Sequence, residues 1–260
     1  MIDIALPIAY ALLFWWFSTG ALLYLDGLPR RSHRWSLLGA GLLAMPAVYG
    51  LHVASAATSV ANAYLAFTCA LLVWAWVEMS FLMGFITGPR RIPCPSEARG
   101  WQRFGLAVGV IWHHELLLIA CLGLIVAVSW GGENQLGTWT FLGLWLMRLS
   151  TKLNVFLGAR NLNESWLPEH LAYLESYFTR RRMNALFPVS LALSLGITWI
   201  VFRAAFVADV TAAESTGLLL LGSLLALGVV EHLFLMLPVS LDAIFRWGFR
   251  SREAADERVS

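Results

Sequence analysis

Long apolar runs, separated by short polar breaks, dominate the hydropathy pattern of this chain. The longest stretch without Asp, Glu, Lys or Arg covers the 43 residues from Trp35 to Val77. Because a helix of about 20 apolar residues crosses a bilayer, runs of this kind are long enough to span a membrane. The pattern predicts seven transmembrane helices, at Leu6–Leu25, Leu37–Ala57, Ala61–Thr87, Phe104–Trp130, Thr138–Leu157, Asn184–Val207 and Gly217–Leu241.

Lys and Arg indicate the orientation of these spans, since cytoplasmic connections of membrane proteins are enriched in both residues. Fifteen of the 18 basic residues follow the first, third, fifth or seventh span, whereas the alternate segments contain acids and, apart from Arg203, no basic residue. Only an odd number of spans gives this alternation. We therefore expect one integral membrane domain over 1–260, with a periplasmic N-terminus and a cytoplasmic C-terminus. His33, among the first group of arginines, is expected to be solvated.

Composition agrees with a multi-pass membrane protein. Hydrophobic residues make up 59% of the 260 residues and charged residues 13%, against roughly 45–50% and about 25% in soluble domains. Mean hydropathy is +0.69. A net charge of +2, scattered over short loops, excludes nucleic acid as a partner. Three cysteines, two of them in apolar runs, imply no disulfide framework.

Ionisable residues recur at one depth of the predicted spans, roughly 13–17 Å above the cytoplasmic edge at about 1.5 Å of helix rise per residue. Charges are costly inside a bilayer, so such residues are functional candidates. The layer contains the acids Glu78, Glu115 and Glu231, the imidazoles of His113, His114 and His232, and Arg148. Adjacent helix residues point about 100° apart, so only one of His113 and His114 can share a site with Glu115. Lys152, one turn after Arg148, can join the layer or snorkel to the cytoplasmic surface.

Three interpretations of this layer remain open. The charges can be ion pairs that fix helix packing, a site for a metal or a tetrapyrrole, or a pathway for protons or ions. No particular metal is indicated, because the chain lacks an HExxH motif and an ExxH pair of the di-iron type. Deep tryptophans suit either helix packing or contact with a flat ligand; they are Trp15, Trp16, Trp74, Trp76, Trp112 and Trp145.

The connection after the fifth predicted span contains an amphipathic pattern. Pro168 suits a first helical turn, and apolar residues follow at three- and four-residue steps, at Leu171, Leu174 and Phe178. The spacing predicts a short amphipathic helix near 168–182 on the cytoplasmic membrane surface. It can act as a plug that closes the bundle or as a docking surface for a partner.

The same connection resembles a known family. Its sequence KLNVFLGARNLNESWLPEHLAYLESYF is similar to the signature of the PuhE-type photosynthetic complex assembly proteins of purple phototrophic bacteria. Chain length, the seven-span layout, Glu78 in the third span and the HHE sequence at His113–Glu115 are also similar. The genes of this family accompany that for the reaction-centre H subunit.

The resemblance implies a protein of the bacterial inner membrane that assists assembly of the reaction centre and light-harvesting complex. It also implies an influence on the supply of bacteriochlorophyll. Besides the lipid bilayer, the implied partners are reaction-centre or light-harvesting subunits and their assembly factors. The family brings no catalytic residues that could be carried over to this chain.

Three functions compete at this point. The first is an assembly factor without catalysis, in which the layer holds bacteriochlorophyll or a precursor. The second is a membrane enzyme that uses a buried carboxylate on a tetrapyrrole or isoprenoid. The third is a proton-coupled transporter. We expect the first, with no catalytic residue, and with a pigment site formed by His113, His114, Glu115, His232, Glu231 and Glu78 together with Arg148.

Overall fold

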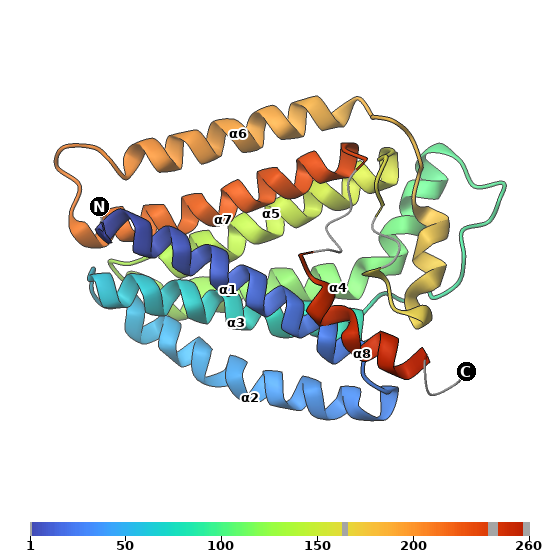
Figure 1. Cartoon of the computed structure of the whole chain (residues 1–260), viewed down its shortest axis with the longest axis horizontal. Coiled ribbons are helices and arrows are strands. Elements are labelled where there is room, and N and C mark those ends of the chain that lie inside the picture. The colour runs from blue at the N-terminus through green and yellow to red at the C-terminus, as the bar shows by residue number, and fades with distance from the viewer. Residues whose placement is uncertain (1, 163–165, 239–243, 257–260) are drawn as a thin grey trace.

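The computed structural model describes residues 2–162, 166–238 and 244–256, and its regular elements in these ranges are all helices (Figure 1). They are α1 (Ile2–Asp26), α2 (Arg30–Ser55), α3 (Val60–Leu82), α4 (Gly100–Val128), α5 (Leu136–Leu157), the 3-10 helix η2 (Glu169–Tyr177), α6 (Leu186–Ala204), α7 (Ala212–Met236) and α8 (Arg246–Asp256). The all-α prediction is confirmed. A long helix is present at each of the seven apolar runs, with ends that differ by several residues.

Six of the long helices, α1 to α4, α6 and α7, are long and apolar enough to cross a membrane. The 22-residue helix α5 falls short of them in apolarity, because it carries Arg148, Lys152 and Asn154. The count of seven spans therefore stays a prediction, as does their orientation.

Helices α3 and α7 form the centre of the bundle. In their most apolar windows 61% and 56% of the residues are buried, against 28% or less in α1, α2, α4 and α6. α2 packs along α3, α6 packs along α7, and α5 contacts both central helices. In Figure 1, α6 and α2 accordingly lie on opposite outer sides of the bundle.

The two ends of the bundle differ in charge. The α1–α2 turn, the connection over 83–99, η2 and α8 lie at one end, on the right of Figure 1, and the α4–α5 and α6–α7 connections lie at the other. We call the first the basic end, because the start of α2 and the connections there carry the arginines Arg30, Arg31, Arg34, Arg90, Arg91, Arg99, Arg160, Arg181 and Arg182. This arrangement matches the alternation in the sequence. Which side of a membrane the basic end faces remains a prediction.

The predicted helix near 168–182 differs from the structure in type and length. It is a 3-10 helix that ends at Tyr177. Its buried residues Leu171, Leu174 and Tyr177 pack against Phe81 at the end of α3 and against Val110 of α4. The segment therefore covers the basic end of the bundle, as a plug would. A docking role for its exposed side stays a prediction.

Backbone pairing stops this helix early. The amide of Ala159 donates to the carbonyl of Thr179 at 3.0 Å, and the amide of Arg181 donates back to the carbonyl of Ala159 at 3.0 Å. Gly158, with φ of 139°, ends α5 and turns the chain toward this pairing. Residues 179–181 are thus extended, so they cannot continue a helix.

Helix α8 was not expected from the sequence, and long-range contacts hold it against α1. The Trp247 ring stacks on Phe17 with 6.0 Å between ring centroids and 20° between planes. A Cβ at Gly20 would collide with Trp247, so only glycine permits this approach. Arg252 Nη2 donates to Asp26 Oδ2 at 3.0 Å, which ties the middle of α8 to the end of α1.

A buried amide network ties α6 to α5. Asn184 Nδ2 donates to Asn154 Oδ1 at 3.0 Å and to the Gly158 carbonyl at 2.8 Å. Its Oδ1 accepts from the amides of Leu186 and Phe187 at 2.9 and 3.0 Å, where α6 begins. The Asn184 side chain therefore caps the start of α6 and also hydrogen-bonds the last turn of α5.

Replacing Asn184 by Ala should lower the free energy of unfolding by on the order of 1–3 kcal/mol, because buried donors and acceptors lose their partners. The measurement is the apparent melting temperature of the purified protein in detergent. Met183→Ala is the control, since Met183 is the exposed neighbour and should leave the melting temperature unchanged. Equal losses in both variants would contradict the role of the network.

Candidate functional site

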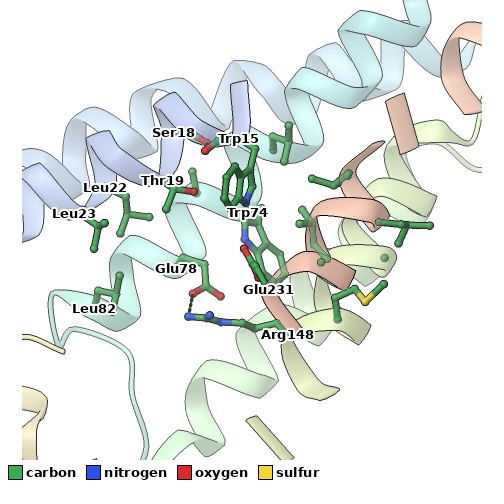
Figure 2. Close-up of a pocket in the computed structure, with 18 of the residues that line it drawn as sticks. Trp15, Ser18, Thr19, Leu22, Leu23, Trp74, Glu78, Leu82, Arg148 and Glu231 are labelled. Carbon is green, nitrogen blue, oxygen red and sulfur yellow. Dashed lines mark hydrogen bonds and ion pairs between the residues drawn. The ribbon is translucent and has the colours of Figure 1, made fainter. Parts of the chain in front are cut away.

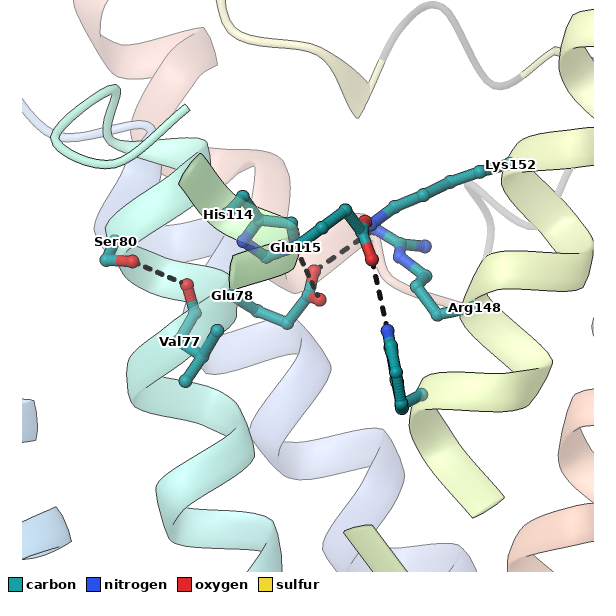
Figure 3. Close-up of polar contacts among 8 residues, drawn as sticks. Val77, Glu78, Ser80, His114, Glu115, Arg148 and Lys152 are labelled. Carbon is teal, nitrogen blue, oxygen red and sulfur yellow. Dashed lines mark hydrogen bonds and ion pairs between the residues drawn. The ribbon is translucent and has the colours of Figure 1, made fainter. Parts of the chain in front are cut away.

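Three of the predicted layer residues meet between α3, α4 and α5 (Figure 3). Arg148 Nη2 of α5 donates to Glu78 Oε2 of α3 at 3.3 Å. His114 Nε2 of α4 faces Glu78 Oε1 at 3.6 Å. The imidazole is fully buried and packs on the Phe81 ring, with 4.5 Å between ring centroids. One carboxylate thus joins three helices.

Glu115 forms a second ion pair beside the first. Its Oε1 accepts a 2.6 Å hydrogen bond from Lys152 Nζ, and its Oε2 accepts one of 3.0 Å from the Trp145 indole. Lys152 therefore turns into the bundle, the first of the two alternatives left by the sequence. The role of Trp145 was not predicted, although Trp145, Arg148 and Lys152 follow at three- and four-residue steps on one face of α5. We call the Glu78, His114, Arg148, Glu115 and Lys152 side chains the charged layer.

Two predicted histidines lie apart from the charged layer. His113 is exposed on the outer face of α4 beside the exposed Trp112, as the 100° step between neighbours requires. His232 is fully buried, with Nδ1 2.8 Å from the Gly228 carbonyl and Nε2 2.8 Å from Ser150 Oγ. Both of its ring nitrogens are occupied, so His232 serves to tie α7 to α5.

Glu231 of α7 completes the set of intramembrane acids. Within the described part of the chain no Lys, Arg or His nitrogen lies within 4 Å of its carboxylate. The carboxylate lies against the Trp15 indole of α1, close to Trp74 and Arg148 (Figure 2). An acid without its own cation is costly in a low-dielectric interior, which makes Glu231 the chemically most conspicuous residue of the group.

Glu231 and Arg148 line two adjacent cavities. The first, of about 170 Å³, lies between α1, α3, α5 and α7 (Figure 2). The second, of about 260 Å³, lies toward the basic end beneath η2. The Arg148 side chain is 40% exposed although it sits deep in the bundle, because the cavities open onto it. Its Nε is buried and has no hydrogen-bond partner.

The linings of the two cavities suit a slender apolar molecule with one polar group. Around Arg148 and Glu231 they are formed mainly by aromatic and aliphatic side chains: Trp15, Trp74, Leu22 and Leu144 in the first, and Phe81, Phe156, Tyr177, Phe178 and Val155 in the second. Both volumes lie below the roughly 300–1,000 Å³ of ordinary small-molecule sites.

The two interior histidines lie outside the linings of the two cavities. Neither His114 nor His232 lines either of them. In the described residues no group of three or more His, Cys, Asp or Glu could hold a metal ion. Of the three predicted imidazoles, His113 is the one whose ring is accessible from outside the bundle.

Two further polar residues are buried although the sequence did not indicate it. His33, expected to be solvated, is 4% exposed, and its Nε2 hydrogen-bonds the Leu28 carbonyl at 2.9 Å. Asp26, which the sequence did not single out, is 4% exposed and pairs with Arg252. Hydropathy cannot reveal either contact, because both depend on how the α1–α2 turn and α8 fold back.

Comparison with known proteins identifies the family. Residues 1–256 match the family described as "Protein of unknown function (DUF3623)". The chain belongs to this family. A Rhodobacter capsulatus protein described as "Uncharacterized 30.4 kDa protein in puhA 5'region" is 39% identical over 254 residues, which cover 95% of this chain and 91% of that protein. No solved structure matches. The comparisons thus cover the whole helical bundle of this DUF3623 protein.

The Glu78–Arg148 pair of this DUF3623 chain should behave as an energetic unit. Arg148→Met leaves a carboxylate buried without its main cation, and should cost about 3 kcal/mol, the lower end for buried pairs because Arg148 also faces the cavities. The double variant Glu78→Gln/Arg148→Met should lose much less than the sum of the two single variants, since neither charge is then stranded.

Thermal unfolding of the unchanged protein, the two single variants and the double variant in one detergent measures this coupling. Glu169→Gln, at an exposed acid of η2, is the control and should unfold like the unchanged protein. Losses that simply add, to within about 0.5 kcal/mol, would show that the two side chains act independently.

Proposed function

We propose that this protein is an integral factor of the bacterial inner membrane that assists assembly of the photosynthetic reaction centre and light-harvesting complex. In this proposal it acts by influencing the supply of bacteriochlorophyll. The observation that carries the proposal is the 39% identity, over nearly the whole chain, to a Rhodobacter capsulatus protein named for its position in the puhA 5' region. The resemblance of Lys152–Phe178 to PuhE-type assembly proteins points to the same process.

The proposal includes seven membrane crossings, with the basic end in the cytoplasm. The low hydropathy of α5 does not oppose a crossing, because Arg148 and Lys152 both form ion pairs inside the bundle. Charged residues of transmembrane helices are tolerated in this way. The clustering of arginines at one end supports the orientation.

The pairing within the charged layer supports a role without catalysis. Glu78 and Glu115 are each held by a cation, and His114 is packed between Glu78 and Phe81. Groups committed to such contacts stabilise the arrangement of α3, α4 and α5. Contact with a pigment would then fall to the outer face of α4, where the exposed imidazole of His113 and the indole of Trp112 lie side by side in sequence. Imidazole nitrogen is a ligand for the metal of a tetrapyrrole.

Deletion of the gene in a phototrophic host, followed by near-infrared absorption spectra of the membranes, tests the assembly role. We expect less assembled reaction centre and light-harvesting complex per membrane protein, restored by the unchanged gene. His113→Ala should restore assembly only in part, whereas Leu116→Ala, at an exposed position one turn away, should restore it fully. Unchanged complexes in the deletion strain would refute the assembly role. Full restoration by His113→Ala would refute pigment contact at α4 alone.

Glu231 favours a second candidate function, a membrane enzyme that acts on an isoprenoid or similar slender apolar molecule. It is the acid without its own cation among the described intramembrane residues, and it lines both cavities beside Arg148. A buried carboxylate of this kind suits general acid–base chemistry. Glu231→Gln should then cause a pigment or isoprenoid intermediate to accumulate while the protein stays folded. Extracts of that strain identical to those of the unchanged strain would remove this candidate.

A further inference from the structure

A separate cleft of about 280 Å³ lies at the basic end, where the start of α2, the connection after α3 and η2 meet. Its polar lining consists of Arg30, His33, Thr87, Arg91, His170 and Tyr173. The other lining residues, all of them described, are apolar or glycine, so no carboxylate faces this space. Four basic or protonatable groups therefore surround a cavity that holds no acid of its own.

The start of α2 adds to the positive potential of the cleft. Arg30 is the first residue of the helix and follows Pro29, and the first turn contains no acid. The exposed N–H groups at a helix start carry a partial positive charge, which favours anions there and disfavours cations. Helix first turns usually carry acids, whereas the first turn of α2 carries Arg30 and His33. A bound anion would offset the repulsion between these basic groups and the helix dipole.

Two hydroxyl groups of the cleft have no partner. Thr87 is 1% exposed, yet its Oγ1 makes no hydrogen bond, and the buried Oη of Tyr173 makes none either. The great majority of buried polar side-chain atoms are hydrogen-bonded. Both hydroxyls can donate, and both belong to residues that line the cleft, although their oxygen atoms are covered. They become donors to an oxygen-rich ligand when it seats directly against them.

The two histidines are held with their other ring nitrogens free. His170 Nε2 donates to the Leu82 carbonyl at 2.8 Å, and His33 Nε2 donates to the Leu28 carbonyl at 2.9 Å. The ring centroids lie 6.2 Å apart. Burial lowers the pKa of His170, and the nearby charges of Arg30, His33 and Arg252 lower it further. The adjacent acid Asp26 is paired with Arg252 at 3.0 Å and also lies near enough to His33 to interact with it electrostatically. Arg30 and Arg91 form no ion pair within the described residues.

Gly84 permits this arrangement. Its φ of 77° lies in the left-handed region, and a Cβ there would come within 2.8 Å of His170 Cδ2. A glycine therefore both ends α3 and lets the imidazole rest on the backbone. The shape of the cleft depends on this close approach.

We propose that this cleft binds a phosphate group, carried by a soluble phosphate compound or by the headgroup of an anionic phospholipid. Guanidinium groups and hydroxyl donors match phosphate oxygens in charge and geometry. A phosphate here would join the start of α2, the end of α3 and η2, and so hold the plug closed over the cavity beneath it. This site is independent of the proposed role in assembly.

The test uses the full-length protein, with inorganic pyrophosphate as the soluble probe and nanodiscs of phosphatidylglycerol or phosphatidylcholine as the lipid probe. Pyrophosphate binding is measured by calorimetry in detergent, and lipid preference by the melting temperature in the two nanodiscs. The variant is Arg30→Gln/Arg91→Gln, both exposed residues that line the cleft. The matched control is Arg99→Gln, an exposed arginine of the same connection outside the cleft. Thr87→Val removes one hydroxyl with little change of shape.

If the site takes a soluble phosphate compound, pyrophosphate binds, the double variant weakens its affinity at least tenfold, Thr87→Val weakens it several-fold, and Arg99→Gln changes it less than twofold. If the source is a lipid headgroup, pyrophosphate binds weakly, and a higher melting temperature in phosphatidylglycerol disappears in the double variant and in Thr87→Val but not in Arg99→Gln. Neither probe binding, or equal losses in the double variant and the control, would overturn the proposal.

Discussion

Two cations on one face of α5 form ion pairs inside an otherwise apolar bundle, and the packing of α3, α4 and α5 depends on these two pairs. Arg148 pairs with Glu78 of α3, and Lys152 pairs with Glu115 of α4. An unpaired charge in such an environment would cost several kcal/mol. The two pairs therefore fix the depth and rotation of three helices against one another, and they allow a helix of modest hydropathy to pack against the central helices α3 and α7.

The same pairing decides which groups remain available for function. Glu115 is paired with Lys152, and Glu78 Oε2 is paired with Arg148. Glu78 Oε1, both ring nitrogens of the buried His114 and Arg148 Nε make no hydrogen bond. Arg148 and Glu231 line both cavities, Glu78 lines the first and Lys152 the second. The interior thus offers a narrow apolar space with a polar centre, whereas accessible imidazole lies on the outer face of α4. This division is why the pigment-handling role rests on His113, and why the candidate enzyme rests on Glu231.

Much of the fold could be predicted from the sequence, because hydropathy is a local property. Each apolar run became a long helix, and the common depth of Glu78, Glu115 and Arg148 followed from helix rise alone. What the pattern could not predict is which side chains face each other across the bundle. Helical spacing alone does not decide whether His113 or His114 points into the bundle. The position of α3 decides it, because His114 is the one that faces Glu78 of α3. Sequence reasoning missed α8 and the burial of His33 for the same reason, since their contacts join residues more than 200 positions apart or depend on the α1–α2 turn. The early end of η2 at Tyr177 goes with the pairing of residues 179–181 with Ala159, which no local periodicity shows.

The central claim is that internal ion pairing lets α5 cross the membrane as a seventh span. Labelling of single cysteines on either side of α5 tests it most directly. With the three native cysteines replaced, Glu133→Cys and Arg160→Cys are each exposed to a membrane-impermeant maleimide in intact cells and in lysed cells. The account predicts that Cys at 133 is labelled in intact cells and that Cys at 160 is labelled only after lysis. Labelling of both positions in intact cells, or of neither, would show that α5 does not cross the membrane.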